Sequence, residues 1–489
     1  MMTRRTFIGG TIASATMLAN STLAASGTDL TRLTLAEASA LIRTGALSPT
    51  QLVEAYLSRI ARLQGSVNAY ITVTDQLALE QAQRLDTELA AGHWRGPLHG
   101  IPIALKDNID TAGIRTTAAS ALLKDRIPNT DAEIYRRLRE AGAILLGKLN
   151  MHEWAWGGTS AITHFGPVHN PWNLAHIPGG SSGGSAAAVS ARLCCAALGT
   201  DTLASIRLPA AYCGVVGLKA THGLNSIRGI IPVAESLDHV GPLCRTVTDS
   251  ALMLQAMAGF DPLDPVSIDA RIPAYVDALY QSPTGLRIGI ARTPFYDRLD
   301  PDIATAVDEA LVVLGTLTAV VREVSLPPPP DFSVLLAESY AYHEQYLAEP
   351  ANHRLYDPVT LERILAAGQV KMPDYVRVRQ ELALVRHAIA KVFTDVDVLI
   401  TPTAPGLPEL ISEAENPAVA SGAESSVRNT FPFNLYGIPT LSMPCGFSRS
   451  GLPIGMQLSS AHLSEPALFT LAQAYEQATA WHRREPPLA

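Results

Sequence analysis

A stretch rich in glycine, serine and alanine constrains this chain more than any other feature. Residues 178–219 read PGGSSGGSAAAVSARLCCAALGTDTLASIRLPAAYCGVVGLK and hold two serine-bearing turns, at Ser181 and at Ser205. Glycine lets a backbone approach another group closely, and converging backbone N–H groups stabilise developing negative charge. The alanine-rich run between the turns is predicted to form one helix that carries Cys194 and Cys195 and brings the two serines side by side at its ends.

A serine hydroxyl is a poor nucleophile unless a base removes its proton. No histidine lies within residues 178–219; His176 comes shortly before them. Lys106 follows the apolar run 101–105, so burial is expected to lower its pKa and to favour the neutral amine that a base requires. A structural ion pair with Asp107 or Asp110 explains the same position, and spacing alone leaves both interpretations open.

The serine-rich stretch resembles the defining segment of the amidase signature family of serine hydrolases. Similar motifs lie in the family's order upstream, in residues 100–110, 147–158 and 165–173, and downstream, in residues 236–259 and more weakly in 431–446 and 451–458. The resemblance implies an α/β amidase signature fold, with a large, mixed, mostly parallel β-sheet covered on both faces by α-helices. Strands and helices alternating along the chain favour the same class.

The resemblance also implies a catalytic triad and no cofactor. Lys106 matches the family's base, Ser181 its bridging serine, which follows a cis peptide bond, and Ser205 its nucleophile. Neutral Lys106 would accept a proton from Ser181, Ser181 would accept one from Ser205, and Ser205 would attack the amide carbonyl. Ser181 would then protonate the leaving nitrogen, because an amide anion is a very poor leaving group.

The turn before Ser205 departs from the family pattern. The backbone N–H groups of Thr202, Leu203, Ala204 and Ser205 are expected to form the oxyanion hole, but Leu203-Ala204 stands where the family has Gly-Gly. Side chains restrict positive φ angles, so the hole is expected to keep its N–H groups with an altered shape. Leu203 is expected to narrow the substrate pocket.

Several neighbouring residues are expected to support this site. Asp201 and Arg207 are interpreted as a structural pair that fixes the turn, and Ser182 as a hydrogen-bonding member of its own turn. For Trp154 and Trp156, packing in the protein core and lining of the substrate pocket remain equally open interpretations. The predicted substrate pocket comprises Trp154, Ala155, Trp156 and Leu203.

The chain is expected to form one catalytic domain over residues 26–489. Expected strands include 100–104, 143–147, 286–290, 320–324 and 396–400, and expected helices include two within 33–63, one at 131–141 and one at 376–392. Residues of about 260–425 match the family loosely and are expected to shape the substrate pocket. Residues 406–426 are polar, contain proline and glycine, and are predicted to form a loop.

The first 25 residues resemble a twin-arginine export signal. Arg4 and Arg5 precede a mildly apolar stretch that ends in small residues. The sequence therefore predicts an exported enzyme of the bacterial periplasm, without stable membrane insertion once the signal is removed. Export argues against the role of glutaminase subunit in a tRNA-dependent amidotransferase, which the family also contains.

Composition and motifs exclude several classes of protein. The net charge is −8 and the basic residues are dispersed, whereas nucleic-acid binding needs a basic face. The thirteen histidines show no metal-ligand spacing, so no metal is expected. Five cysteines do not suit a disulfide framework and are expected to be buried thiols. Residues 179–183 also satisfy G-x-S-x-G, but a loop rather than a strand precedes them, which disfavours an α/β-hydrolase elbow.

These inferences predict an amidase that acts through a seryl acyl-enzyme on small, largely apolar amides such as aryl acylamides. A carbamate (urethane) or ester hydrolase of the same family is the alternative. A non-catalytic binding protein on this fold would be expected to lack Lys106, Ser181 or Ser205, and all three are present. The expected partner is a small-molecule amide; monomer and homodimer both remain open.

Overall fold

The computed structural model describes residues 29–415 and 426–488, so the expected export signal lies outside the described residues. These residues build an 11-stranded sheet in the order β1-β3-β2-β4-β6-β5-β10-β11-β9-β7-β8. The strands are β1 Tyr70–Val73, β2 Pro102–Lys106, β3 Ile144–Leu149, β4 Ala196–Asp201, β5 Val216–Lys219, β6 His239–Cys244, β7 Arg287–Ile290, β8 Val320–Glu323, β9 Val398–Pro402, β10 Thr440–Phe447 and β11 Pro453–Ser460.

The α/β class and the mixed sheet are confirmed, but parallel pairing is less common than expected. Parallel pairs are confined to β3-β2-β4 and to β9-β7-β8. The other six pairs are antiparallel and include the whole centre of the sheet from β4 to β9. The centre is antiparallel partly because β10 and β11 follow each other closely in the chain and pair directly.

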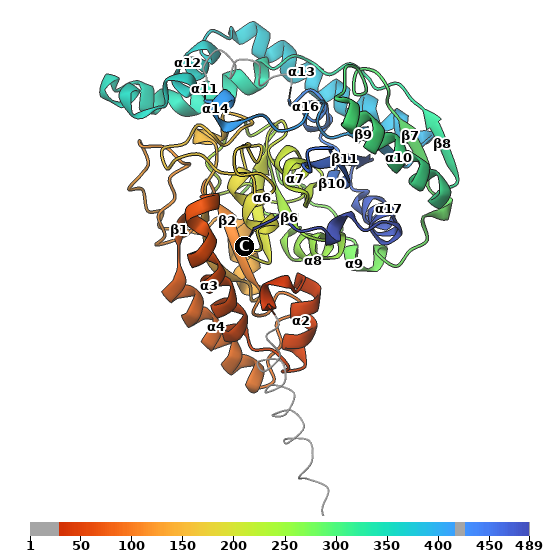
Figure 1. The fold of residues 1–489 in the computed structure, drawn as a ribbon. Helices are drawn as coiled ribbons and strands as arrows, with labels where there is room; N and C mark the ends of the chain where they lie inside the picture. The colour runs from red at the N-terminus through yellow and green to blue at the C-terminus, as the bar shows by residue number, and fades with distance from the viewer. Residues whose placement is uncertain (1–28, 416–425, 489) are drawn as a thin grey trace, which may run out of the picture.

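Helices cover both faces of the sheet (Figure 1). The α-helices are α2 Leu35–Arg43, α3 Pro49–Val67, α4 Asp75–Ala90, α5 Glu133–Glu140, α6 Gly183–Ser190, α7 Arg207–Cys213, α8 Val247–Met257, α9 Tyr275–Ala278, α10 Pro301–Leu317, α11 Ser333–Leu347, α12 Pro358–Ala367, α13 Met372–Ala388, α14 Ile411–Ala414, α16 Phe431–Leu435 and α17 Glu465–Ala478. Short 3-10 turns are η1 Leu30–Arg32, η2 Glu153–Ala155, η3 Pro283–Gly285, η4 Pro350–Leu355, η5 Ile389–Thr394 and η7 Trp481–Arg483.

The alternation of side chains along β5 shows that α7 and α8 lie on different faces of the sheet. A Cβ on Gly217 would stand 2.7 Å from the Cβ of Ala210 in α7, so glycine is needed where this helix approaches the sheet. The neighbouring side chains, Val216 and Leu218, lie in a cluster with Val247 and Leu254 of α8. Successive strand residues point to opposite faces, so α7 and α8 cover opposite sides of the sheet.

The alanine-rich run is the main local correction to the sequence prediction. It forms α6 and then the central strand β4, rather than one helix, and Cys194 and Cys195 lie in the connection. Arg192 there has a φ of 58°, in the left-handed region, which follows the end of α6. Tertiary pairing of β4 with β2 and β6 overrides the helix propensity of alanine.

The helices α11, α12 and α13 form a separate layer at the top of Figure 1, above α7 and α16. This layer falls within the region expected to shape the substrate pocket. Within the predicted loop 406–426, the structure describes residues 406–415, which include the single turn α14. The prediction of buried, free cysteines is confirmed for all five.

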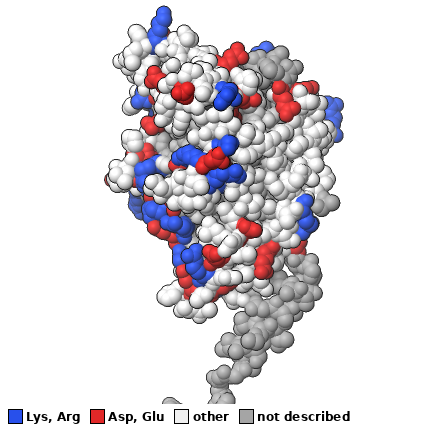
Figure 2. Space-filling model, turned by 90° about the vertical axis from the view of Figure 1, so that its left-hand side faces the viewer, with Lys and Arg blue, Asp and Glu red and all other residues white. Residues whose placement is uncertain are grey.

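The charges on the surface and the lengths of the helices bear on possible partners. On the face shown in Figure 2, basic and acidic side chains are interspersed and large areas carry no charge. A single-sign field of the kind that nucleic acids require is therefore not visible on this face. Within residues 29–415 and 426–488, every helix is too short or too polar to cross a membrane.

Candidate active site

Lys106 is the last residue of β2, and its side chain is completely buried. Its Nζ lies 2.7 Å from Ser181 Oγ, 2.8 Å from Thr200 Oγ1 and 3.4 Å from the Thr200 carbonyl oxygen. A neutral amine has two N–H donors and one lone pair. The two Thr200 oxygens can accept the donors, which leaves the lone pair to accept the Ser181 hydroxyl proton.

The environment of Lys106 favours this neutral form. Burial lowers the pKa of Lys106 from 10.5 to about 7, and the more distant charges of Asp201 and Asp238 oppose the shift only in part. No carboxylate of the described residues forms an ion pair with its Nζ; the neighbouring Asp107 lies 3.5 Å from Lys148 instead. The arrangement therefore suits a proton acceptor better than the structural ion pair that the sequence left open.

Ser181 and Ser205 lie at the ends of two connections that meet beside α6 and α7. The Gly180-Ser181 peptide is cis, and the Ser181 side chain is fully buried. Ser205 is half-buried and lines a pocket together with Gly180. Among the described residues, Lys106 bonds to Ser181, but no hydrogen bond involves the Ser205 hydroxyl.

Ser182 joins the two serine-bearing turns rather than bonding within its own turn. Its backbone N–H donates to the Ser205 carbonyl oxygen at 3.2 Å. Its hydroxyl donates to the Thr200 carbonyl oxygen at 3.1 Å and accepts from the Thr200 N–H at 3.3 Å. Glycine at 199 leaves space for this contact, because a Cβ there would stand 2.8 Å from Ser182 Oγ.

The turn expected to form the oxyanion hole accommodates its unusual residues without a left-handed backbone. Leu203 and Ala204 are absent from the positions with positive φ, so a side chain carries no backbone penalty at either position. Within the described part of the chain, no hydrogen bond uses the N–H groups of Leu203, Ala204 or Ser205. These donors are available to a substrate oxygen in the pocket.

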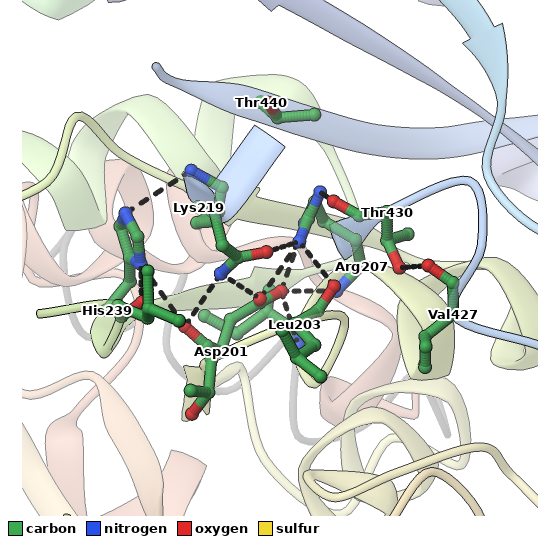
Figure 3. Close-up of polar contacts among 12 residues, drawn as sticks. Asp201, Leu203, Arg207, Lys219, His239, Val427, Thr430 and Thr440 are labelled. Atoms are coloured by element: carbon green, nitrogen blue, oxygen red, sulfur yellow. Dashed lines mark hydrogen bonds and ion pairs between the residues drawn. The ribbon is translucent and has the colours of Figure 1, made fainter. Parts of the chain in front are cut away.

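Asp201 and Arg207 form a buried ion pair across this turn (Figure 3). Arg207 Nη2 lies 2.9 Å from Asp201 Oδ1, and Nε lies 3.0 Å from Oδ2. Asp201 Oδ2 also accepts the Ile206 N–H at 3.0 Å, and Arg207 Nη2 donates to the Leu203 carbonyl oxygen at 3.1 Å. Although burial raises the pKa of Asp201, Arg207 outweighs it and brings that pKa to about 2. The pair thus bonds to backbone groups on both sides of the turn.

A second buried pair behind Asp201 was missed by the sequence analysis. His239 Nδ1 donates to the Leu237 carbonyl oxygen at 2.6 Å, which leaves Nε2 to accept from Lys219 Nζ at 3.3 Å. Figure 3 shows His239 and Lys219 on the side of Asp201 opposite Arg207. Burial lowers the pKa of both Lys219 and His239. Only the antiparallel pairing of β4 with β6, which places Asp201 opposite His239, reveals this contact.

Asp238 is a further residue that the sequence did not single out. Its Oδ1 accepts the Thr202 hydroxyl at 2.5 Å, and its Oδ2 accepts the N–H groups of Val233 and Ala234 at 2.9 and 3.1 Å. Burial raises the pKa of Asp238 to about 7. Asp238 thus ties the turn before Ser205 to a second loop that lines the pocket.

The pocket beside Ser205 has a volume of about 430 Å³ and is mainly apolar. Ala155, Trp156 and Leu203 line it, as the sequence predicted. The sequence analysis expected the region of about 260–425 to shape the pocket, but it did not name the residues that do so, nor the two that lie outside this region. These residues are Val233, Phe332, Leu335, Leu336, Arg363, Ala366, Ala367 and Val427.

Trp154 does not line the pocket, contrary to one of the two interpretations. Its side chain is 1% exposed and packs against Tyr342, His343, Tyr346 and Tyr356. Both Trp154 and the next residue have positive φ angles, so the chain turns sharply between the two tryptophans. Trp154 therefore packs against the helical layer, whereas Trp156 lines the pocket.

Among the described residues that line the pocket, the charged one is Arg363. It projects from α12, and its Nη1 donates to the Trp156 carbonyl oxygen at 3.0 Å. No group of three histidine, cysteine, aspartate or glutamate side chains in the described ranges has the geometry of a metal site.

Comparison with known proteins places this geometry in a family. The profile of the family named Amidase matches residues 51–469. The chain belongs to the amidase family. A curated relative from Thermosynechococcus vestitus, a glutamyl-tRNA(Gln) amidotransferase subunit, is 42% identical over 469 residues, which cover 90% of this chain and 97% of the relative.

Solved structures of other amidase-family enzymes share the fold. The peptide amidase of Stenotrophomonas maltophilia is 34% identical, with a TM-score of 0.80 over 93% of this chain and 98% of that one. A structure described in connection with the evolutionary origins of an s-triazine catabolic enzyme is 34% identical, with a TM-score of 0.85 over 92% of this chain and 99% of the other. The predicted enzyme class, an amidase acting on carbon–nitrogen bonds other than peptide bonds, is confirmed at this level.

The curated relatives contradict the predicted export to the periplasm. Several of them are named as the corresponding subunit of a glutamyl-tRNA(Gln) amidotransferase. A charged tRNA is used at ribosomes inside the cell, so a periplasmic location does not follow for a chain of this kind. The exclusion of an amidotransferase role, which depended on export, is withdrawn with it.

Proposed function

We propose that this amidase hydrolyses small, largely apolar amides, with aryl acylamides as the first choice, through an acyl-enzyme on Ser205. The observation that carries the proposal is the buried contact of 2.7 Å between Lys106 Nζ and Ser181 Oγ, next to a pocket that Ser205 lines. A lysine with a pKa of about 7 is neutral in a large fraction of molecules near neutral pH. Such a lysine can act as the general base.

The proposed proton path has two steps, and the contact between Lys106 and Ser181 supports the first of them. Lys106 accepts the Ser181 proton while Ser181 accepts the Ser205 proton, and Ser205 Oγ bonds to the carbonyl carbon. The N–H groups of Leu203, Ala204 and Ser205, with that of Thr202 nearby, stabilise the resulting oxyanion. Ser181 then protonates the leaving nitrogen, the C–N bond breaks, and water hydrolyses the acyl ester by the same path.

The lining of the pocket supports an apolar substrate. Leu203, Trp156 and Phe332 present hydrocarbon surface next to Ser205, and such surface favours binding by about 25 cal/mol for each Å² removed from water. An aromatic ring fits a pocket of about 430 Å³ lined in this way.

A second candidate is the release of ammonia from glutamine as one component of an amidotransferase. It is favoured by the 42% identity with an amidotransferase subunit over 97% of that relative's length. Glutamine is a zwitterion with two charged groups to be matched, and the pocket offers Arg363 for one of them. The chemistry at Ser205 would be the same, with ammonia as the leaving group.

A hydrolysis panel on the full chain distinguishes these candidates. The substrates are p-nitroacetanilide, benzamide, glutamine, p-nitrophenyl acetate and a phenyl carbamate, each with the wild type and with Ser205→Ala. Turnover of the anilide that disappears in the variant is the expected result. Turnover of glutamine alone would favour the amidotransferase role, and turnover of the activated ester alone would contradict amide hydrolysis.

A further inference from the structure

A second hollow lies beside the pocket that contains Ser205. Its volume is about 420 Å³, and Gly158 lines both hollows. Thr159 lines the second one, and it packs directly behind Gly180, which lines the first. A Cβ on Gly180 would stand only 2.8 Å from the Thr159 backbone nitrogen. Because Gly180 precedes Ser181 in the chain, the second hollow adjoins the pocket on the side of Ser181.

Two guanidinium groups line this second hollow, those of Arg298 and Arg428. Arg428 donates from Nη2 to the Asp297 carbonyl oxygen at 2.5 Å and from Nε to Asn429 Oδ1 at 3.2 Å. Within the described ranges, neither arginine forms an ion pair with a carboxylate. Burial and the charge of Arg298 lower the pKa of Arg428, and the charge of Asp297 opposes that shift in part.

One acidic side chain, Glu409, also lines this hollow. Burial and the neighbouring Glu413 raise the pKa of Glu409. The lining of the hollow therefore carries two arginines, which remain charged at any physiological pH, and one glutamate. A bound anion would relieve the repulsion between the arginines and could accept paired hydrogen bonds from either of them.

We infer that the second hollow binds a carboxylate carried by the amine half of the substrate, as in an N-acylated aminobenzoate. The inference rests on the proposed function, in which Ser181 donates its proton to the leaving nitrogen. The amine half then lies on the side of Ser181, next to Thr159 and the arginines, while the acyl half occupies the apolar pocket. As the C–N bond breaks, the nitrogen takes the Ser181 proton and the neutral amine leaves with its carboxylate; water later removes the acyl group from Ser205.

Matched substrates test this charge preference. Acetanilide and 3-acetamidobenzoate share an acyl group and an aniline nitrogen, and they differ by one carboxylate. In Arg298→Gln, kcat/KM for 3-acetamidobenzoate should fall about tenfold, the equivalent of about 1.4 kcal/mol, while kcat/KM for acetanilide stays within about twofold. Arg298 is exposed and has a φ of 48°. Glutamine and lysine would have to adopt the same left-handed backbone conformation, so the two substitutions differ only in the charge of the side chain. Arg298→Lys should therefore retain most of the preference.

Arg322→Gln is the matched control, because it removes one positive charge from the exposed strand β8, away from both hollows. It should leave both substrates unchanged. An equal loss on both substrates in Arg298→Gln, or no loss on either, would overturn the inference.

A binding experiment separates this inference from the proposed function. Titration calorimetry with Ser205→Ala should show 3-aminobenzoate binding at least about tenfold more tightly than aniline. Added salt and Arg298→Gln should both reduce that difference, because the contact is electrostatic. Equal binding of the two amines would refute the carboxylate site even if the wild type hydrolyses anilides. A clear difference without any hydrolysis would retain the site and reject the proposed function.

Discussion

The Lys106 side-chain nitrogen and the Ser181 hydroxyl oxygen lie 2.7 Å apart, and both side chains are fully buried. Residues 75 positions apart in the chain thus form a contact from which bulk water is excluded. Because burial disfavours the cation, the pKa of Lys106 falls to about 7, and the contact joins an amine that is partly neutral near physiological pH to a serine hydroxyl. The first predictions concern this link.

Ser205→Ala should reduce kcat for anilide hydrolysis by at least about 10³-fold, because the acyl group then has no oxygen to which it can transfer. Steady-state kinetics together with the melting temperature provide the measurement. Ser250→Ala is the control, since the Ser250 hydroxyl is buried in α8 without a hydrogen bond among the described residues and lines neither hollow. Near-normal turnover by Ser205→Ala would reject Ser205 as the nucleophile.

The rate of hydrolysis of a neutral anilide should rise with pH. Lys106 has a pKa of about 7, below the usual value for lysine, and only its neutral form can accept a proton. Below pH 7, kcat/KM should therefore rise about tenfold for each pH unit, and above about pH 8 it should level off. A profile over pH 5–9 measures this dependence, and a maximum below about pH 6 would contradict a lysine base.

Asp238 needs a control in that experiment, because its pKa is also about 7. Asp238→Asn removes this ionisation and leaves Lys106 in place. The rise below pH 7 should persist in the variant at a lower absolute rate. Loss of the rise would assign it to Asp238 instead.

Asp201→Asn should destabilise the fold by about 3 kcal/mol, because Arg207 would remain buried without its counter-charge. Asp201 has a pKa of about 2, depressed from 3.8, so its contribution is fully present above about pH 4 and is lost as the pH falls through about 2. Urea unfolding at pH 7 measures the loss. Glu381→Gln, which breaks an exposed pair with Arg377, should cost less than about 0.5 kcal/mol.

Thr202→Val should lower kcat about tenfold with little change in KM. The substitution keeps the shape of the side chain but removes the hydroxyl that Asp238 accepts at 2.5 Å, so the turn before Ser205 loses its tie to the neighbouring loop. Thr202→Ser keeps the hydroxyl and should restore most of the rate. If both variants lose only melting temperature and keep kcat, the tie is structural and does not position the turn.

Leu203→Gly should change which acyl groups the enzyme prefers. Leu203 lines the pocket next to Ser205, and removing its side chain forfeits about 1–3 kcal/mol of apolar contact. KM for acetanilide should rise by about tenfold or more, whereas anilides with longer acyl chains should lose less. The measurement is kcat/KM over a series of acyl lengths, and a uniform effect across the series would place Leu203 outside the acyl site.

Local sequence signals predicted many elements well. The two helices expected within 33–63 are present as α2 and α3, and α3 begins after Ser48 with proline at its first helical position. The all-apolar run ending at Lys106 identified β2, since a strand buried on both faces has no polar alternation. The prediction of a single helix for the alanine-rich run was wrong. Alanine favours helix locally, whereas β4 is specified by its neighbours in the sheet.

The sequence by itself determined the residue types of the candidate site and their family, because Lys106, Ser181 and Ser205 stand in motifs whose order and spacing are specific. Their catalytic roles remain predictions. The tertiary structure alone decided which distant groups surround them. Asp238 reaches Thr202, His239 lies behind Asp201, and helices α11 and α12 close the pocket. These contacts join segments far apart in the chain, and packing between strands and helices leaves no local pattern from which they could be read.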